Sequence, residues 1–281
     1  MQIILYALII LLLMLYPGDT ARFAQEALTI WGTAIVPALF PYMVFSRMLC
    51  QRLYALNLPA APIAAVLGLI GGSPSGAAII AATSEHQSPR TIHALCALCG
   101  TVSPMFILGT LSHWTNNASR CRLLLTIHWI TAVLCAGIIW LSEKKHSFPV
   151  SSRKGNVQPS FDNPIMQSMD AILQVGGCII CYSVLAGLIG RFFPEDSPLN
   201  SLLHVFLEIS GGAHAIWQGT FSMNAKGILL SASLGFSGLS ILAQNYAFLR
   251  TLGISMRRLI FYALLRAISS AAFMACALNF S

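Results

Sequence analysis

Apolar residues occupy the chain in long blocks that contain no charged side chain. These uncharged runs are residues 1–18, 27–46, 53–84, 91–119, 123–142, 171–190, 209–225, 227–249 and 267–281. A helix that crosses the hydrocarbon core of a bilayer needs about 20 apolar residues, so the pattern predicts that the chain crosses or enters a membrane about nine times. The first run lacks the basic segment and the small-residue cleavage site of a signal peptide, which predicts a retained first helix.

Composition excludes a water-soluble fold and several functions. Hydrophobic residues make up 56% of the 281 positions and charged residues 9%, against about 25% charged residues in an average soluble domain. The net charge of +7 comes from bases at the ends of apolar runs, where the positive-inside rule places them. We therefore expect the lipid bilayer as a partner and no nucleic acid. The sequence contains no metalloprotease, P-loop or serine-hydrolase motif, so no enzyme is predicted.

Two Cys-x-x-Cys pairs stand within apolar runs, at Cys96 and Cys99 and at Cys178 and Cys181. This spacing occurs in zinc and redox sites. On a membrane helix, however, cysteine more often serves as a small packing residue. The sequence predicts no metal site and no cofactor, and it leaves open a coupling ion, either Na⁺ or H⁺.

Residues 142–164 differ from the rest of the chain because they are polar, basic and rich in proline. They predict a linker between residues 1–141, an N-terminal helix with a first repeat, and residues 165–281, a second repeat. Offsets of 140 and 135 residues align identical residues of the two halves: Tyr42 with Tyr182, Val44 with Val184, Gly71 and Gly72 with Gly211 and Gly212, Gly100 with Gly235, and Arg122 with Arg257. Each half also has the same order of helix, Gly-Gly break, interrupted helix and closing helix, which indicates a repeat.

The Gly-Gly segments predict two re-entrant helical hairpins. The sequence GGSPSG at 71–76 divides a long apolar run into legs of about 12 residues, each about 18 Å long and too short to cross the bilayer. Residues 199–221 are divided in the same way at 210–212. The fold class predicted is therefore an all-α polytopic membrane protein with two repeats of inverted topology.

Charge supports the hairpins. If all nine runs spanned the membrane, Lys and Arg would divide 8 to 7 between the two sides, whereas two hairpins give a division of 10 to 5. One side then holds Arg47, Arg52, Arg90, Lys144, Lys145, Arg153, Lys154, Arg250, Arg257 and Arg258, and the other holds Arg22, Arg120, Arg122, Arg191 and Lys226. The positive-inside rule places the N-terminus and the linker in the cytoplasm.

Four breaks at mid-membrane predict a binding site for a small polar or anionic solute. Serine is a good N-cap and proline suits the first helical position, so Ser73-Pro74 and Ser103-Pro104 predict new half-helices whose N–H groups point at a ligand. The second half has breaks at 210–212 and 235–238. The alternative is that these residues only kink packed helices. Candidate binding residues are Gly72, Ser73, Ser75, Thr101, Ser103, Glu208, His214, Ser237, Ser240 and Gln244.

Glu208 and Arg266 are isolated charges within long apolar sequence. Because a buried carboxylate is unfavourable in a bilayer, Glu208 is a candidate proton carrier or solute ligand. Its alternatives are a helix cap or a partner of His204 or His214. Arg266 is predicted either to hold an anion or to pair with Glu208.

Four patches resemble the sporulation integral membrane protein family of the YlbJ type: residues 31–48 (WGTAIVPALFPYMVFSRM), 71–77 (GGSPSGA), 103–110 (SPMFILGT) and 234–244 (LGFSGLSILAQ). The resemblance runs over nearly the whole chain from about residue 25. Family members carry a tyrosine at the place of Ser73 and a Ser-Gly pair before the proline of the second motif, where this chain has Val102-Ser103, so the solute stays open.

The resemblance implies a nucleoside-recognition gate domain, organised like concentrative nucleoside transporters. It also implies a protein of the cytoplasmic or outer forespore membrane of an endospore-forming bacterium, linked to the passage of dipicolinic acid during sporulation. Two alternatives remain: a transporter of nucleoside-type solutes, or a non-transporting scaffold or assembly partner with a tightly packed midplane. The sequence also leaves open whether copies associate into a homo-oligomer.

Overall fold

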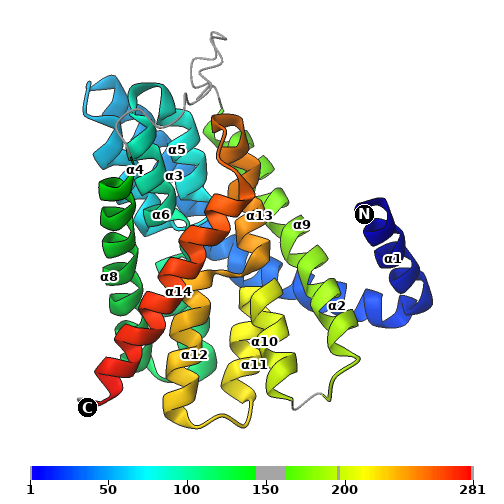
Figure 1. Ribbon diagram of the computed structural model, residues 1–281. Helices are drawn as coiled ribbons and strands as arrows, with labels where there is room; N and C mark the ends of the chain where they lie inside the picture. Colours follow the sequence, from blue (N-terminus) through cyan, green and yellow to red (C-terminus); the bar gives the residue numbers. More distant parts are fainter. Residues whose placement is uncertain (1, 144–162, 195–196, 280–281) are drawn as a thin grey trace.

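The computed structural model describes residues 2–143, 163–194 and 197–279, and within these ranges every regular element is a helix (Figure 1). The first half contains α1 (Gln2–Leu15), α2 (Pro17–Ile30), a π-helix η1 (Trp31–Ile35), α3 (Val36–Ala55), α4 (Ala60–Gly71), α5 (Ser75–Thr83), η2 (Ser84–His86), α6 (Pro89–Cys99), a second π-helix η3 (Phe106–Leu111), α7 (Ser112–Thr115) and α8 (Ala118–Ser142). The second half contains α9 (Pro164–Gly190), α10 (Pro198–Leu207), α11 (Ile209–Gln218), α12 (Met223–Phe236), α13 (Gly238–Leu249), η4 (Arg250–Leu252) and α14 (Met256–Asn279).

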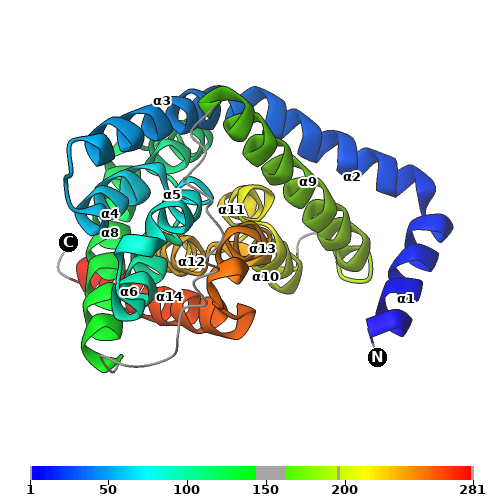
Figure 2. The same cartoon turned by 90° about the horizontal axis from the view of Figure 1, so that it is seen from above.

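Five helical segments of the described chain are long and apolar enough to cross a membrane: Pro17–Ala55, Ala118–Ser142, Pro164–Gly190, Met223–Leu252 and Met256–Asn279. The predicted polytopic α-helical class is therefore confirmed. The first segment joins α2, η1 and α3 in one helix of 39 residues. At about 1.5 Å per residue it is far longer than the roughly 30 Å hydrocarbon core, so it must tilt. In Figure 2, where α13 is seen nearly end-on, α2 and α3 run lengthwise across the molecule.

The helical legs predicted for both hairpins are present. α4 packs against α5 and α10 packs against α11. The legs have 12, 9, 10 and 10 residues, which at about 1.5 Å per residue is too short to span the membrane. Figure 1 shows α4 and α5 in the upper part of the molecule and α10 and α11 in the lower part. Each half follows the order long helix, hairpin, interrupted helix, long helix, while the inverted symmetry between the halves stays a prediction.

The second hairpin turns earlier than the sequence suggested. The predicted break at 210–212 lies within the first turns of α11, and the helix is interrupted at Glu208, which has an extended backbone. Gly212 serves another purpose, because a Cβ there would lie 2.3 Å from backbone atoms of Val205. Gly212 therefore lets the two legs approach closely, and the Glu208 carboxylate caps the helix that follows the turn.

Small residues also bring the first hairpin against α6. A Cβ on Gly68 would lie 2.6 Å from the Cys99 sulfur, and a Cβ on Gly76 would lie 2.7 Å from the Cys99 Cβ. Cys96 and Cys99 are both buried free thiols. Cys99 thus fills the space between α4, α5 and α6, as expected for a cysteine that packs membrane helices.

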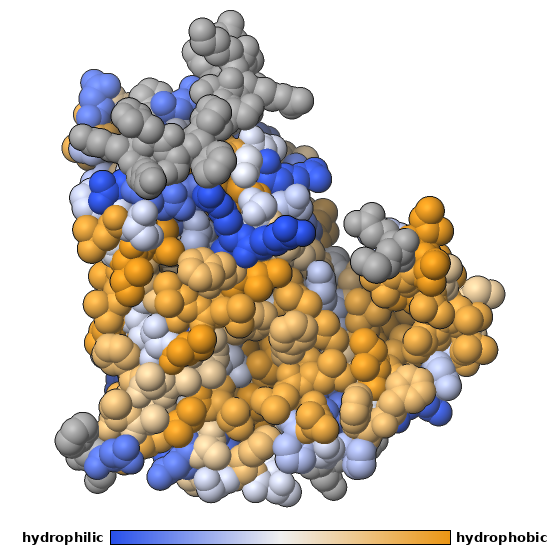
Figure 3. Space-filling model, viewed as in Figure 1, coloured by the Kyte–Doolittle hydropathy of each residue, from blue (hydrophilic) through white to orange (hydrophobic). Residues whose placement is uncertain are grey.

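Charged residues gather at the two ends of an apolar band (Figure 3). At one end, Arg258 reaches Glu143 and Arg90 lies over the ring of Trp140, which joins the start of α14 and α6 to the end of α8. At the other end, Arg120 donates to the Met223 carbonyl, which joins the start of α8 to the start of α12. The two ends of α8 thus lie at opposite polar faces. Residues 144–162 of the predicted linker lie outside the described residues.

We predict that the chain enters and leaves the first hairpin on the same face of the membrane. Single cysteines at positions 55 and 87, in a cysteine-free background, should both react with an impermeant thiol reagent from the cytoplasmic side. A cysteine at Asn117 should react only from the other side, because α8 separates it from that face. Labelling of positions 55 and 87 from opposite sides would contradict the hairpin.

Candidate functional site

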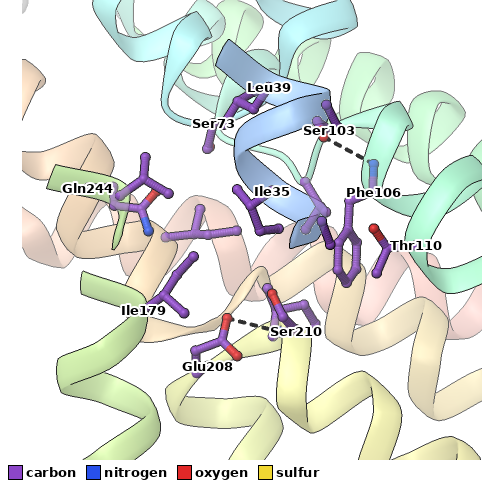
Figure 4. Close-up of a pocket in the computed structure, with 16 residues that line it drawn as sticks. Ile35, Leu39, Ser73, Ser103, Phe106, Thr110, Ile179, Glu208, Ser210 and Gln244 are labelled. Carbon is purple, nitrogen blue, oxygen red and sulfur yellow. Dashed lines mark hydrogen bonds between the residues drawn. The ribbon is translucent and has the colours of Figure 1, made fainter. Parts of the chain in front are cut away.

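A cavity lies where the hairpin tips and the interrupted helices of both halves meet (Figure 4). Its volume is about 50 Å³. It is lined by Ala34, Ile35, Ala38, Leu39, Ser73, Val102, Ser103, Phe106, Thr110, Val175, Ile179, Glu208, Ile209, Ser210, Ile241 and Gln244. Three of the four predicted breaks and the first turn after the fourth contribute to this lining, and η1, α3, η3, α9 and α13 supply most of the rest. Sequence positions far apart therefore build one site.

The first half contributes two serines with different roles. The Ser103 hydroxyl accepts a hydrogen bond from the Phe106 N–H at 3.2 Å and so caps the helix that begins at Pro104, as predicted. Ser73 was expected to cap α5 in the same way, but α5 has no side-chain cap. Instead the Ser73 hydroxyl accepts from the Asn245 amide at 2.8 Å. That bond ties the tip of the first hairpin to the second half of the chain.

The tip of the first hairpin also rests on the first broken helix. The Ser73 N–H donates to the Thr101 carbonyl at 2.7 Å. Gly72 has φ +63°, and a Cβ on it would lie 2.6 Å from backbone atoms of Ser103. Gly238, at φ +77°, makes the corresponding approach in the second half, where a Cβ would lie 3.2 Å from the Ile209 N. In each half, therefore, the hairpin tip packs against the break of the neighbouring helix, and a glycine lies at the contact. A larger residue at Gly72 or Gly238 would strain the backbone.

Among the described residues that line the cavity, Glu208 is the only charged one, and it caps α11. Its carboxylate accepts hydrogen bonds from the N–H groups of Ser210 at 3.0 Å and Gly211 at 2.8 Å, and the residue is 3% exposed. A half-helix N-terminus favours negative charge, which stabilises the carboxylate. The cap alternative for Glu208 is therefore correct. At this break, the N–H groups of Ser210 and Gly211 are therefore already occupied by the protein's own carboxylate.

The predicted pairing of Glu208 with Arg266 is wrong. Among the described residues, Arg266 donates to the carbonyls of Ala97, Gly100 and Gly235, and no ion pair joins it to a carboxylate. Three carbonyl oxygens thus take the place that a carboxylate would fill. The charge of Glu208 is left facing the cavity.

The structure divides the other candidate residues into three groups. Ser73, Ser103, Glu208 and Gln244 line the cavity. Gly72, Thr101 and Ser240 contact lining residues from outside the cavity, and the Ser240 hydroxyl accepts from the Gln244 amide at 3.3 Å. Ser237 is buried at the fourth break, and its hydroxyl donates to the Leu234 carbonyl. Ser75 is buried outside the lining, and His214 is exposed, with its ring 5.2 Å from the ring of Trp114.

Sequence reasoning missed the apolar half of the site. Ile35 and Thr110 belong to the two π-helices, η1 and η3, and both line the cavity. π-Helical turns concentrate at functional sites. Pro37 could have predicted an irregular turn at η1, because a proline inside a helix removes one N–H and crowds the carbonyl four residues earlier. Ile179 of α9, by contrast, carried no local signal that distinguished it from the rest of its helix.

The cavity in this conformation suits only a very small occupant. A single water needs about 10–15 Å³ of such space. A volume of about 50 Å³ therefore holds a few waters, and an aromatic solute could enter only if the walls moved. Four hydroxyls, one carboxylate and one amide line the cavity and can hydrogen-bond an occupant, while isoleucine and leucine side chains make up much of the remaining wall.

No protein-family model and no solved structure matches the chain. One curated protein does: the sporulation integral membrane protein YlbJ of Bacillus subtilis (strain 168) is 23% identical over 316 residues, which cover 92% of this chain and 77% of that protein. The chain is related to a sporulation integral membrane protein. This relation supports the YlbJ-type resemblance, and with the five apolar helices it is consistent with an integral membrane protein.

We predict that Gly72→Ala and Gly238→Ala each destabilise the protein by about 1–3 kcal/mol, because both force a side chain into a left-handed backbone. The measurement is the thermal unfolding midpoint of the purified protein in detergent. Gly137→Ala in α8 is the matched control, since a Cβ there meets nothing within 4 Å. Midpoints that fall equally in all three variants would show that the breaks have no special need for glycine.

Proposed function

We propose that the protein is a transporter that moves a small polar or anionic solute through the bilayer by way of the cavity between the breaks. One observation carries the proposal: irregular backbone from both halves meets around a cavity that contains a buried carboxylate, an amide and hydroxyls, within an otherwise apolar helical fold. Non-helical backbone at membrane depth is tolerated only where it is buried in protein or lines a wet cavity. Discontinuous helices that converge on a central site are typical of secondary transporters.

The resemblance to the YlbJ type suggests dipicolinic acid as the solute and the outer forespore membrane as the location. The cavity places a condition on this assignment, because dipicolinate is a dianion and Glu208 lines the site. Two unit charges 4 Å apart interact by about 4 kcal/mol at an effective dielectric constant of 20. Repulsion of that size would prevent binding. An anion must therefore enter with a proton on Glu208 or with a cation, such as Na⁺, beside it.

Two alternatives make different predictions. A nucleoside-type solute is neutral, so its movement would need no proton on the carboxylate. A scaffold or assembly partner needs no cavity, and its midplane would be filled with apolar side chains. The buried carboxylate and the serines that line the cavity favour transport over the scaffold, because burying polar groups without a use is unfavourable.

The test is uptake of labelled dipicolinate and of labelled nucleosides by liposomes that contain the purified protein. We expect saturable dipicolinate uptake that decreases as the pH rises, because the charged form of Glu208 repels the anion. Nucleoside uptake without dipicolinate uptake would support the alternative solute. Liposomes that take up neither solute faster than empty liposomes would contradict transport of both classes.

Glu208→Gln keeps the shape of the side chain and removes its charge. We expect this variant to lose the pH dependence of uptake while it still inserts and folds, because its amide oxygen can still cap α11. Glu26→Gln is the control, since the Glu26 side chain is 59% exposed and far from the cavity lining. An unchanged pH profile in Glu208→Gln would place the coupling group elsewhere.

A further inference from the structure

Arg266 is the most deeply buried cation among the described residues, with 1% of its surface exposed. A charged side chain at the bilayer centre costs about 2.5–3.5 kcal/mol on insertion scales. Arg266 lies in the middle of α14, which packs against α12, α8 and α6. Because Arg266 does not line the cavity and pairs with no carboxylate there, its burial needs another explanation.

The guanidinium joins the ends of two helices. Nη1 donates to the Ala97 carbonyl at 2.9 Å and Nη2 to the Gly100 carbonyl at 2.7 Å, both at the C-terminal end of α6. Nε donates to the Gly235 carbonyl at 3.2 Å, at the C-terminal end of α12. The last carbonyls of a helix have no partner within the helix and carry partial negative charge. One cation therefore satisfies two helix ends at once.

These two helix ends occupy corresponding places in the two halves. Gly100 and Gly235 are 135 residues apart, and each is followed within a few residues by a break that borders the cavity. At the same offset Arg266 corresponds to Thr131 of α8. The Thr131 hydroxyl lies 2.8 Å from that of Ser270 and reaches neither glycine. A single side chain from the second half thus bridges both breaks.

Two glycines lie beside Arg266, one on each of the helix ends that it joins. A Cβ on Gly235 would lie 2.8 Å from the Arg266 carbonyl oxygen, so α12 and α14 are in backbone contact at this point. A Cβ on Gly100 would lie 3.5 Å from Nη1. Glycine at both places lets the planar group reach carbonyls on two helices. Lysine has one ammonium group and cannot reproduce this fork.

We infer that Arg266 is a positioning residue that fixes the distance between the two helix breaks and thereby sets the width of the cavity. The inference goes beyond the proposed function, because it concerns the geometry of the cavity and does not depend on which solute, if any, is carried. Its readout must therefore report on the cavity wall and not on uptake.

The reporter is a cysteine at Ile241, which lines the cavity, in a protein whose native cysteines are replaced. We would measure how fast a small neutral thiol reagent modifies it in the folded, monodisperse fraction. Arg266→Lys should raise this rate by about tenfold, the factor that corresponds to the loss of one charge-assisted hydrogen bond. Arg257→Lys, an exposed change on the same helix, should leave the rate unchanged.

Arg266→Gln is the second variant, because a neutral side chain inserts more easily while its amide can reach only one of the two helix ends. It should raise the rate in the same way. A folded Arg266→Lys or Arg266→Gln protein with an unchanged modification rate would overturn the inference. Failure of both variants to fold, with Arg257→Lys folded, would show that Arg266 serves folding alone and would also overturn it.

Discussion

The fold depends on how the backbone groups at the helix breaks are satisfied without water. Within a bilayer an unpaired N–H or carbonyl costs several kcal/mol, so each interruption of a helix requires a partner from elsewhere in the chain. Arg266 supplies that partner for the carbonyls at the ends of α6 and α12. Glu208 supplies it for the N–H groups at the start of α11, and Ser103 for the helix that begins at Pro104. The two isolated charges of the apolar sequence thus have one structural purpose in common.

Only one of these two charged residues, Glu208, faces the cavity. Arg266 is enclosed by carbonyls behind the breaks, and its charge contributes nothing to the cavity lining. Glu208 caps a helix and also faces the cavity, so the same carboxylate that stabilises the second hairpin sets the charge that an occupant meets. Protonation of such a group would change solute affinity and hairpin stability together. That coupling is what a transporter needs if solute entry is to move the hairpin.

Much of the architecture could be predicted from the sequence because its causes are local. Proline and glycine within apolar runs located the breaks, and leg length alone gave the two hairpins. The contacts across the molecule could not be predicted. The sequence around Ser73 does not predict its hydrogen bond with Asn245, and the sequence around Arg266 does not predict its bond with Gly100. These residues meet only after both halves have folded.

The site was predicted in its polar part and missed in its apolar part for the same reason. Serines and a glutamate inside apolar runs are conspicuous, whereas Ile179 is one isoleucine among many. The misplaced turn of the second hairpin is instructive. The Gly-Gly pair predicts a break at 210–212, but the helix is interrupted at Glu208, whose carboxylate satisfies two N–H groups, while Gly212 serves contact between the legs.

The proposed transport requires that the cavity between the breaks can be reached in turn from each side of the membrane. The most direct measurement is the reaction of a single cysteine at Thr110, a cavity-lining residue, with an impermeant thiol reagent added to either face of sealed vesicles. The account predicts reaction from each face in separate experiments and slower reaction when solute is present. A cysteine that reacts from one face only, or from neither, would contradict it.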